Sequence, residues 1–241
     1  MSLKIDIVRC LSDNYAYIIY DTYSKNVGVV DPSEFDKINT FLEKKYNKLD
    51  FIINTHHHAD HIGGNSELKK KFNSKIVAYS GDTYRINDVD IKVNDNEIFH
   101  FGKTKFKVLK IPGHTSGHIS FYSSEEKVIF TGDTLFSFGC GRIFEGSYLE
   151  MFNSLKKIKS LPKDTKIYFG HEYTVNNINF CLSFDQKNIF LNKKLEEIKS
   201  NLKNNIFSTP SILEDELKGN LFLKANNPAE FKKYRELKDS F

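Results

Sequence analysis

Residues 55–65 read THHHADHIGGN, a stretch that places four histidines and an aspartate within seven positions. In an extended loop alternate side chains point the same way, so His56, His58 and Asp60 could converge on one point. A helix would turn residues two apart in different directions, and the zincin pattern of two histidines with an intervening glutamate is not present. The apolar run at 51–53 is typical of a buried strand. The stretch therefore predicts a metal-binding loop that follows a strand.

A solvated histidine-rich loop and the remnant of an affinity tag are the alternatives for this stretch. Its position far inside the chain disfavours a tag. The interleaved aspartate, and the helix start that follows at 66–72, disfavour a chance cluster. If the metal hypothesis is right, further ligands are expected at the ends of other strands.

The composition is that of an ordinary globular protein. Of the 241 residues 39% are hydrophobic and 27% charged, which suits one large domain or one domain with an appendage. No apolar run approaches the length of a membrane span, so no membrane partner is expected. The N-terminal residues enter strand-like alternation with no signal or transit pattern, so we expect a cytoplasmic protein.

Cysteine and charge patterns narrow the expected cofactors and partners. Cys10, Cys140 and Cys181 lie far apart and form no CxxC pair, so neither a disulfide framework nor a thiolate zinc site is expected. The net charge of +4 comes from scattered lysines, which suits a small acidic substrate and does not imply a nucleic-acid partner. We expect a monomer or a weak oligomer.

The hydrophobic pattern predicts an α/β domain followed by helices. The first thirty residues read as paired strands, and further strands are predicted at 51–53, 76–79, 106–111, 119–122, 128–130 and 167–169. Capping boxes predict helices that begin at Ser33 and Ser147. The strand signals then stop, and helices are predicted at 191–202, 211–219 and 228–241. We therefore expect an α/β domain at 1–172 and a helical domain at 173–241.

Three more predicted strands are each followed by glycine and a side chain that can bind a metal. His114 follows the strand at 106–111, and Asp133 and His171 follow two later strands in the same way. Ligands gather at the carboxyl ends of adjacent strands in an α/β sheet, and a preceding glycine allows a close approach. Together with the strand at 51–53, metal-capable side chains thus follow four predicted strands, which strengthens the metal hypothesis.

These donors suffice for two ions that share a water or hydroxide. The predicted ligands are His56, His58 and His114 for one ion, Asp60, His61 and His171 for the second, and Asp133 as a bridge. A donor set of nitrogen and oxygen suits two divalent ions, with zinc preferred and iron or manganese as alternatives. Two such ions lower the pKa of a bound water and polarise a carbonyl or phosphoryl oxygen, so the predicted chemistry is hydrolysis.

The motifs THHHADH, GHTSGH, GD and GHEYT resemble those of the metallo-β-lactamase superfamily. The segments GCGRIFEG at 139–146, GHEYTVNN at 170–177 and YRELKDSF at 234–241 are similar to its glyoxalase II (hydroxyacylglutathione hydrolase) branch. The resemblance runs nearly the whole chain. It implies an αββα sandwich with a C-terminal helical domain, and cleavage of the thioester S-D-lactoylglutathione to D-lactate and glutathione in methylglyoxal detoxification.

The resemblance also assigns side chains that bind glutathione, namely Arg142, Phe144, Tyr173, Arg235 and Lys238. Arginine stands at 142 where lysine is usual, and phenylalanine at 144 where tyrosine is usual. The second change removes a hydroxyl, and with it a hydrogen bond of about 1 kcal/mol. Arg235 and Lys238 are three residues apart on a predicted helix, so they share a face and could clamp a carboxylate.

The mechanism that the resemblance implies uses a hydroxide held by both ions. The hydroxide attacks the thioester carbon and the ions stabilise the oxyanion. Asp60 and Asp133 are the expected catalytic carboxylates, with Asp60 also orienting the nucleophile. A thiol with a pKa of about 8.5 leaves as thiolate without a dedicated acid.

Several other interpretations stand beside these. His57 is interpreted as a structural or supporting residue, His100 and His118 as hydrogen-bonded or surface histidines, and Cys140 as a packed thiol. The nearest functional alternative is a persulfide dioxygenase of the same superfamily, which uses one iron. A processing nuclease would need a basic RNA-binding surface that the sequence does not indicate, and a non-catalytic metal-binding protein would not need so complete a ligand set.

Overall fold

The computed structural model describes residues 2–241, which form two compact units. The first unit contains the residues up to Lys110 together with 117–132, and the second contains 111–116 together with 133–241. Within residues 2–241, no helix combines the length and the apolar character that a bilayer span requires.

The first sheet of the first unit is mixed, with strand order β1-β2-β3-β4-β5-β6. Its strands are β1 (Leu3–Cys10), β2 (Asn14–Asp21), β3 (Val27–Val30), β4 (Phe51–Ile53), β5 (Lys75–Tyr79) and β6 (Val89–Val93). Strands β1 to β3 pair antiparallel, whereas β3 to β6 pair parallel. The carboxyl ends of β3 and β4 therefore point the same way, and the loops that follow the two strands begin at the same end of the sheet.

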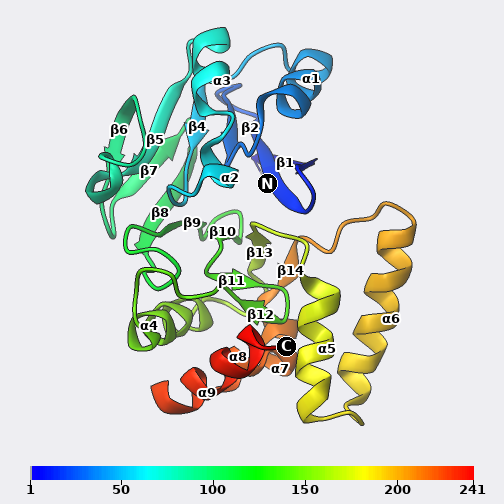
Figure 1. Ribbon diagram of the computed structural model, residues 1–241. Helices are drawn as coiled ribbons and strands as arrows, with labels where there is room; N and C mark the ends of the chain where they lie inside the picture. The colour runs from blue at the N-terminus through cyan, green and yellow to red at the C-terminus, as the bar shows by residue number, and fades with distance from the viewer. Residues whose placement is uncertain (1) are drawn as a thin grey trace. The chain divides into compact units, whose positions relative to one another are not determined.

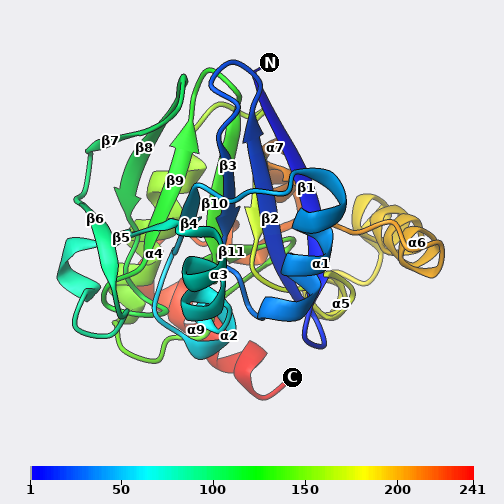
Figure 2. The ribbon, with the colours of Figure 1, turned by 90° about the horizontal axis from the view of Figure 1, so that it is seen from above.

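Helices α1 (Phe35–Lys45) and α3 (Asn65–Phe72) cover one face of this sheet, in front of its blue strands in Figure 2. Ile38 and Leu42 of α1 and Leu68 of α3 share one buried cluster with strand residues. The capping box predicted at Ser33 is wrong, because the N-cap of α1 is Glu34 and its side chain makes no capping bond. Burial of its apolar face, and not an N-terminal cap, therefore stabilises this helix.

A second set of strands in the first unit is antiparallel, in the order β10-β9-β8-β7. Its members are β7 (Ile98–Phe101), β8 (Thr104–Lys110), β9 (Ile119–Ser123) and β10 (Val128–Gly132). Aromatic rings fill the space between the two sets of strands. Phe51 of β4 lies 5.7 Å from the rings of both Phe99 and Phe101, and Tyr17 lies 5.6 Å from Phe130. The core of the first unit is therefore a layer between two sheets.

The second unit is mainly helical, as Figure 1 shows for the antiparallel neighbours α5 and α6. Its helices are α4 (Tyr148–Lys159), α5 (Thr174–Phe184), α6 (Ile189–Lys203), α7 (Leu213–Gly219), α8 (Leu221–Lys224) and α9 (Pro228–Asp239). Its strands are β11 (Leu135–Phe136), β12 (Gly139–Cys140), β13 (Lys166–Phe169) and β14 (Ser211–Ile212). The capping box predicted at Ser147 is confirmed. The helix start predicted at Ser211 is wrong, because that residue pairs with Ile167 in a short strand.

Candidate metal centre

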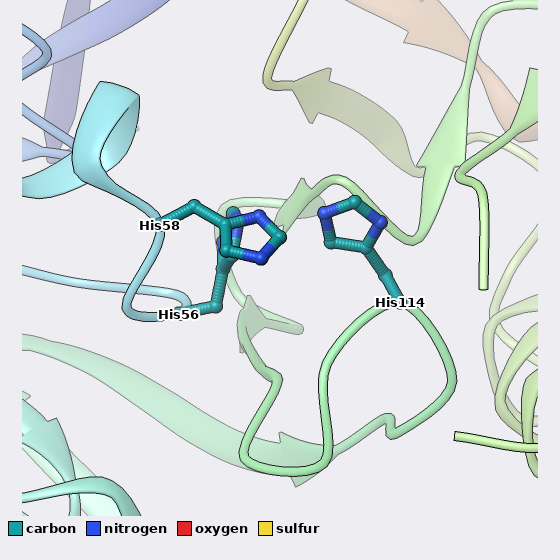
Figure 3. Close-up of side chains that lie close together, drawn as sticks. All are labelled: His56, His58 and His114. Atoms are coloured by element: carbon teal, nitrogen blue, oxygen red, sulfur yellow. The ribbon is translucent and has the colours of Figure 1, made fainter. Parts of the chain in front are cut away.

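Four of the predicted ligands lie in the segment that follows β4. His56 and His58 project from the loop, with ring centroids 4.8 Å apart, and both are drawn in Figure 3. Asp60 and His61 lie in the short helix α2 (Ala59–Ile62), so the expectation of an extended loop is wrong for this pair. The segment combines a loop and one helical turn, and it still gathers these side chains on one side of the first unit.

Asp31, the residue after β3, orients two of these histidines. Its Oδ2 accepts a hydrogen bond of 2.6 Å from Thr55 Oγ1 and lies 3.1 Å from Nδ1 of His61. Thr55 Oγ1 in turn lies 3.0 Å from Nδ1 of His56. Nδ1 of each ring therefore has an oxygen partner, and this arrangement directs Nε2 towards a metal in many metalloproteins. Ligand atoms of Asp31, His56 and His61 all lie within 4.8 Å of one another.

The carboxylate of Asp60 is held by Asn14, a buried residue at the start of β2. Asn14 Nδ2 donates to Asp60 Oδ2 at 3.0 Å and to its carbonyl at 3.1 Å. The same Oδ2 lies 3.6 Å from Nε2 of His61. Asp60 and His61 therefore present an oxygen and a nitrogen donor side by side.

His57 and His118 take supporting positions in the first unit. Nδ1 of His57 lies 3.4 Å from the buried carboxylate of Asp82, which fits the structural interpretation of this histidine. His118 is fully buried and its ring stacks on that of His56 at 4.6 Å and 17°. A surface position for His118 is therefore excluded, whereas His100 is exposed as expected. A side chain on Gly132, at φ +46°, would collide with His118 and Thr55, so the stack requires glycine there.

The second unit carries the three remaining predicted ligands, and they converge on one atom. Nε2 of His114 lies 3.4 Å from Oδ2 of Asp133, and Nε2 of His171 lies 3.2 Å from the same oxygen. His114, shown in Figure 3 on the loop after β8, donates from Nδ1 to the carbonyl of Arg142 at 2.8 Å. All three side chains are buried. One carboxylate oxygen and two imidazole nitrogens, all donors that suit a divalent metal, therefore lie side by side in the second unit.

The donor chemistry in each unit fits divalent metal ions. His56, His61 and His114 each use Nδ1 for an oxygen partner, which leaves Nε2 of a neutral imidazole for a metal. Nitrogen and carboxylate donors suit zinc, iron and manganese. Burial raises the pKa of the Cys140 thiol to about 11, so this residue stays a packed thiol, as the sequence indicated.

Two aromatic side chains predicted to bind substrate lie against proposed ligands of the second unit. The ring of Phe144 lies 5.2 Å from that of His114, and the ring of Tyr173 stacks on that of His171 at 4.9 Å and 2°. Phe144 is 63% exposed and Tyr173 39% exposed, although both are aromatic. Large exposed rings beside the predicted ligand histidines are available to a bound molecule.

Two of the three basic residues predicted to bind substrate, Arg142 and Arg235, contact Asp239, and Lys238 bonds Asn176. Arg142 Nε lies 3.5 Å and Arg235 Nη2 lies 2.9 Å from Oδ1 of Asp239. Arg235 is buried, whereas 62% of the Arg142 side chain is exposed. Burial, together with the like charges of Arg235 and Arg142, lowers the pKa of Lys238 to about 8. The second unit therefore carries a positive cluster, Arg142, Arg235 and Lys238, suited to an anionic group.

Comparison with known proteins identifies relatives over nearly the whole chain. Residues 12–171 match the model of the metallo-beta-lactamase superfamily, and residues 172–241 match the model of the hydroxyacylglutathione hydrolase C-terminus. A hydroxyacylglutathione hydrolase of Pelagibacter ubique (strain HTCC1062) is 49% identical over 239 residues, covering 99% of this chain and 100% of the relative. One of Rhodopseudomonas palustris (strain BisB5) is 40% identical, covering 95% and 90%.

Solved structures share the architecture at lower identity. ETHE1 from Myxococcus xanthus aligns with a TM-score of 0.75 at 23% identity, covering 97% of this chain and 90% of that chain. The BLEG-1 B3 metallo-beta-lactamase aligns with a TM-score of 0.72 at 20% identity, covering 92% and 100%. Together with the family models, these alignments confirm the predicted metallo-β-lactamase fold with a C-terminal helical domain.

Proposed function

The chain belongs to the hydroxyacylglutathione hydrolase (glyoxalase II) family of the metallo-β-lactamase superfamily, and we propose on this premise that it cleaves S-D-lactoylglutathione to D-lactate and glutathione. The observation that supports this choice of substrate lies within the second unit. Phe144 and Tyr173 lie directly against His114 and His171, in the same unit as the positive cluster. A molecule with a thioester and terminal carboxylates matches these features.

We propose that two divalent ions, zinc with iron or manganese as alternatives, are held by the predicted set His56, His58, His114, Asp60, His61, His171 and Asp133. The sequence motifs and the geometry inside each unit support this assignment. When bound, two such ions would lower the pKa of a shared water and polarise the thioester carbonyl.

The residues of the chain then have distinct tasks in hydrolysis. Asp60, held by the hydrogen bond from Asn14, orients the attacking water. Oδ2 of Asp133 lies next to both His114 and His171, so this carboxylate is placed to serve as a ligand beside both of them. Lys238 and Arg142 bind carboxylate of the glutathione part through charge-assisted hydrogen bonds. The sulfur leaves as thiolate, which requires no acid from the protein because a thiol pKa lies only about one to two units above neutrality.

We propose further that residues 1–172 form the catalytic domain and 173–241 the domain that binds the glutathione part, with Tyr173, Arg235 and Lys238 in the latter. The residue ranges of the two family models support this division of roles. We also propose that the protein is cytoplasmic and that it is a monomer or a weak oligomer.

The direct test is hydrolysis of S-D-lactoylglutathione by the metal-loaded protein, followed by loss of the thioester absorbance. Wild type should turn over, and Asp133→Ala should lose at least about a hundredfold in kcat, because charge stabilisation worth several kcal/mol disappears. Lys238→Ala should chiefly raise KM. An inert, fully metallated wild type that consumes oxygen with glutathione persulfide would instead support the dioxygenase alternative.

A further inference from the structure

A short hairpin in the second unit, residues 135–140, is held by the helices that follow it. Its ladder pairs only Leu135 with Cys140 and Phe136 with Gly139. The four carbonyls from 137 to 140 each accept a bond from a different side chain, as follows: Asn177 Nδ2 to Ser137 at 3.1 Å, Cys181 Sγ to Phe138 at 3.4 Å, Asn220 Nδ2 to Gly139 at 3.2 Å and Arg235 Nη1 to Cys140 at 2.6 Å. In addition, the Phe138 N–H donates to Glu216 Oε2 at 2.7 Å.

These five partner side chains are all buried, with exposures of 4% or less. A buried carbonyl or N–H without a partner costs free energy, so the hairpin depends on bonds that its own two short strands cannot supply. Phe138 also adopts φ +54°, a left-handed conformation that is unfavourable for a phenylalanine. The bonds to the Phe138 N–H and to the Phe138 carbonyl hold this residue in place.

The hairpin connects directly to proposed site residues at both ends. Asp133 lies two residues before it, and Arg142 and Phe144 lie just after it. Gly141 N–H donates to the Thr134 carbonyl at 3.3 Å, and a side chain at 141 would collide with the Asp133 carbonyl. Displacement of the hairpin would therefore move the segment that carries Arg142 and Phe144.

We propose that Glu216 and Asn220 are positioning residues for substrate binding, which act by holding the 135–140 hairpin so that Arg142 and Phe144 keep their places beside His114. Glu216 acts through the Phe138 N–H, and Asn220 acts through the Gly139 carbonyl. Asn220 also donates to Glu216 at 3.0 Å, so the two side chains form one buried unit. The kinetic part of this inference rests on the proposed function, whereas its structural part does not.

The structural test is hydrogen exchange of residues 135–146 in the metal-loaded full chain. Glu216→Ala should speed exchange in this segment by about tenfold, and Glu216→Gln, which keeps an acceptor for the Phe138 N–H, should stay close to wild type. Glu214→Ala is the matched control, since Glu214 is an exposed residue of the same helix that pairs with Lys218. Unchanged exchange in Glu216→Ala, or an equal rise throughout the second unit, would overturn the proposal.

The kinetic test separates positioning from general stability. Glu216→Ala should raise KM for S-D-lactoylglutathione about tenfold and change kcat by less than about threefold, and Glu216→Gln should restore KM. A fall in kcat at constant KM, or no rescue by glutamine, contradicts the inference. A wild type that does not hydrolyse the thioester would refute the proposed function alone, because the exchange result still decides the role of the hairpin bonds.

A second variant covers the case in which Glu216→Ala fails to fold. Asn220 caps α8 by accepting from the Phe222 N–H at 3.0 Å. Asn220→Ser keeps an acceptor for this cap but is too short to reach the Gly139 carbonyl. The same local rise in exchange is expected for this variant, and its absence would overturn the role of Asn220.

Discussion

Asp31 shows how a side chain outside the proposed ligand set can govern metal binding. It bonds Thr55 and lies beside Nδ1 of His61. Asp31→Asn should weaken metal affinity about 10- to 100-fold, because the ring of His61 loses its anionic partner. Competition with a chelator measures this change. Asp36→Asn, on the exposed side of α1, is the control, and equal affinities for the two variants would contradict the expectation.

Lys238 provides a pH prediction at the same scale. Burial, with help from Arg235 and Arg142, lowers its pKa to about 8. The side chain is therefore charged below about pH 8 and neutral above it, and only the charged form attracts a carboxylate. KM for S-D-lactoylglutathione should rise as pH increases from 7 to 9, and Lys238→Met should lose this dependence. A pH profile of KM that is equally steep in both proteins would refute the assignment.

The sequence predicted the ligand candidates because each one follows a recognisable strand, and inside each unit the structure brings several of them together. Asp31 ends the apolar run VGVVD in the same manner, so this signal was present in the sequence although its role was missed. The role of Asn14 had no local signal, because Asn14 contacts Asp60 across 46 positions of sequence. Long-range polar contacts of this kind depend on strand pairing that residue patterns do not specify.

At the scale of elements, the capping box of α4 allows a test of helix stability. Ser147 Oγ accepts from the Glu150 N–H at 3.2 Å, and the Glu150 carboxylate accepts from the Ser147 N–H at 2.8 Å. Ser147→Ala should lower the free energy of unfolding by about 1 kcal/mol, as measured by urea denaturation. Ser33→Ala should change it less, because that serine does not cap α1. A larger loss at Ser33 would contradict this comparison.

Most elements that sequence patterns missed are short or only partly buried; the exception is α5, an 11-residue helix with five buried residues in a stretch where no helix was predicted. In β6 and β7 exposed positions alternate with buried or partly buried ones, and both strands contain charged or histidine residues, so their apolar signal is weak. β14 has two residues, and its pairing with β13 decides their conformation. The continuous apolar runs at β4, β9 and β13 were predicted within one residue of their ends, because burial on both faces makes such strands distinct.

At the scale of the whole molecule, Glu216 should make stability depend on pH. Burial raises its pKa from 4.5 to about 7, against the effect of the Phe138 and Asn220 bonds. The folded protein binds this proton more tightly than the unfolded chain does. The stabilisation is therefore complete below about pH 4.5 and is lost as pH rises through 7, by up to about 3 kcal/mol.

Chemical denaturation at pH 5 and pH 8 measures this effect. Glu216→Gln cannot ionise, so it should show a smaller decrease in the free energy of unfolding between the two pH values. Glu214→Ala should behave as wild type does, because Glu214 is exposed. Parallel curves for wild type and Glu216→Gln would show that another group controls the pH dependence.

The hairpin bonds have a consequence for the design of chimeric enzymes. One design for changing which thiol carrier the enzyme accepts is to replace all residues after 172 with the corresponding region of a relative. Such a graft would also replace Asn177, Cys181, Glu216, Asn220 and Arg235, which together bond the backbone from 137 to 140. Recombinants should therefore tolerate a crossover only when donor and acceptor chains agree at these positions, or when the crossover lies before the hairpin.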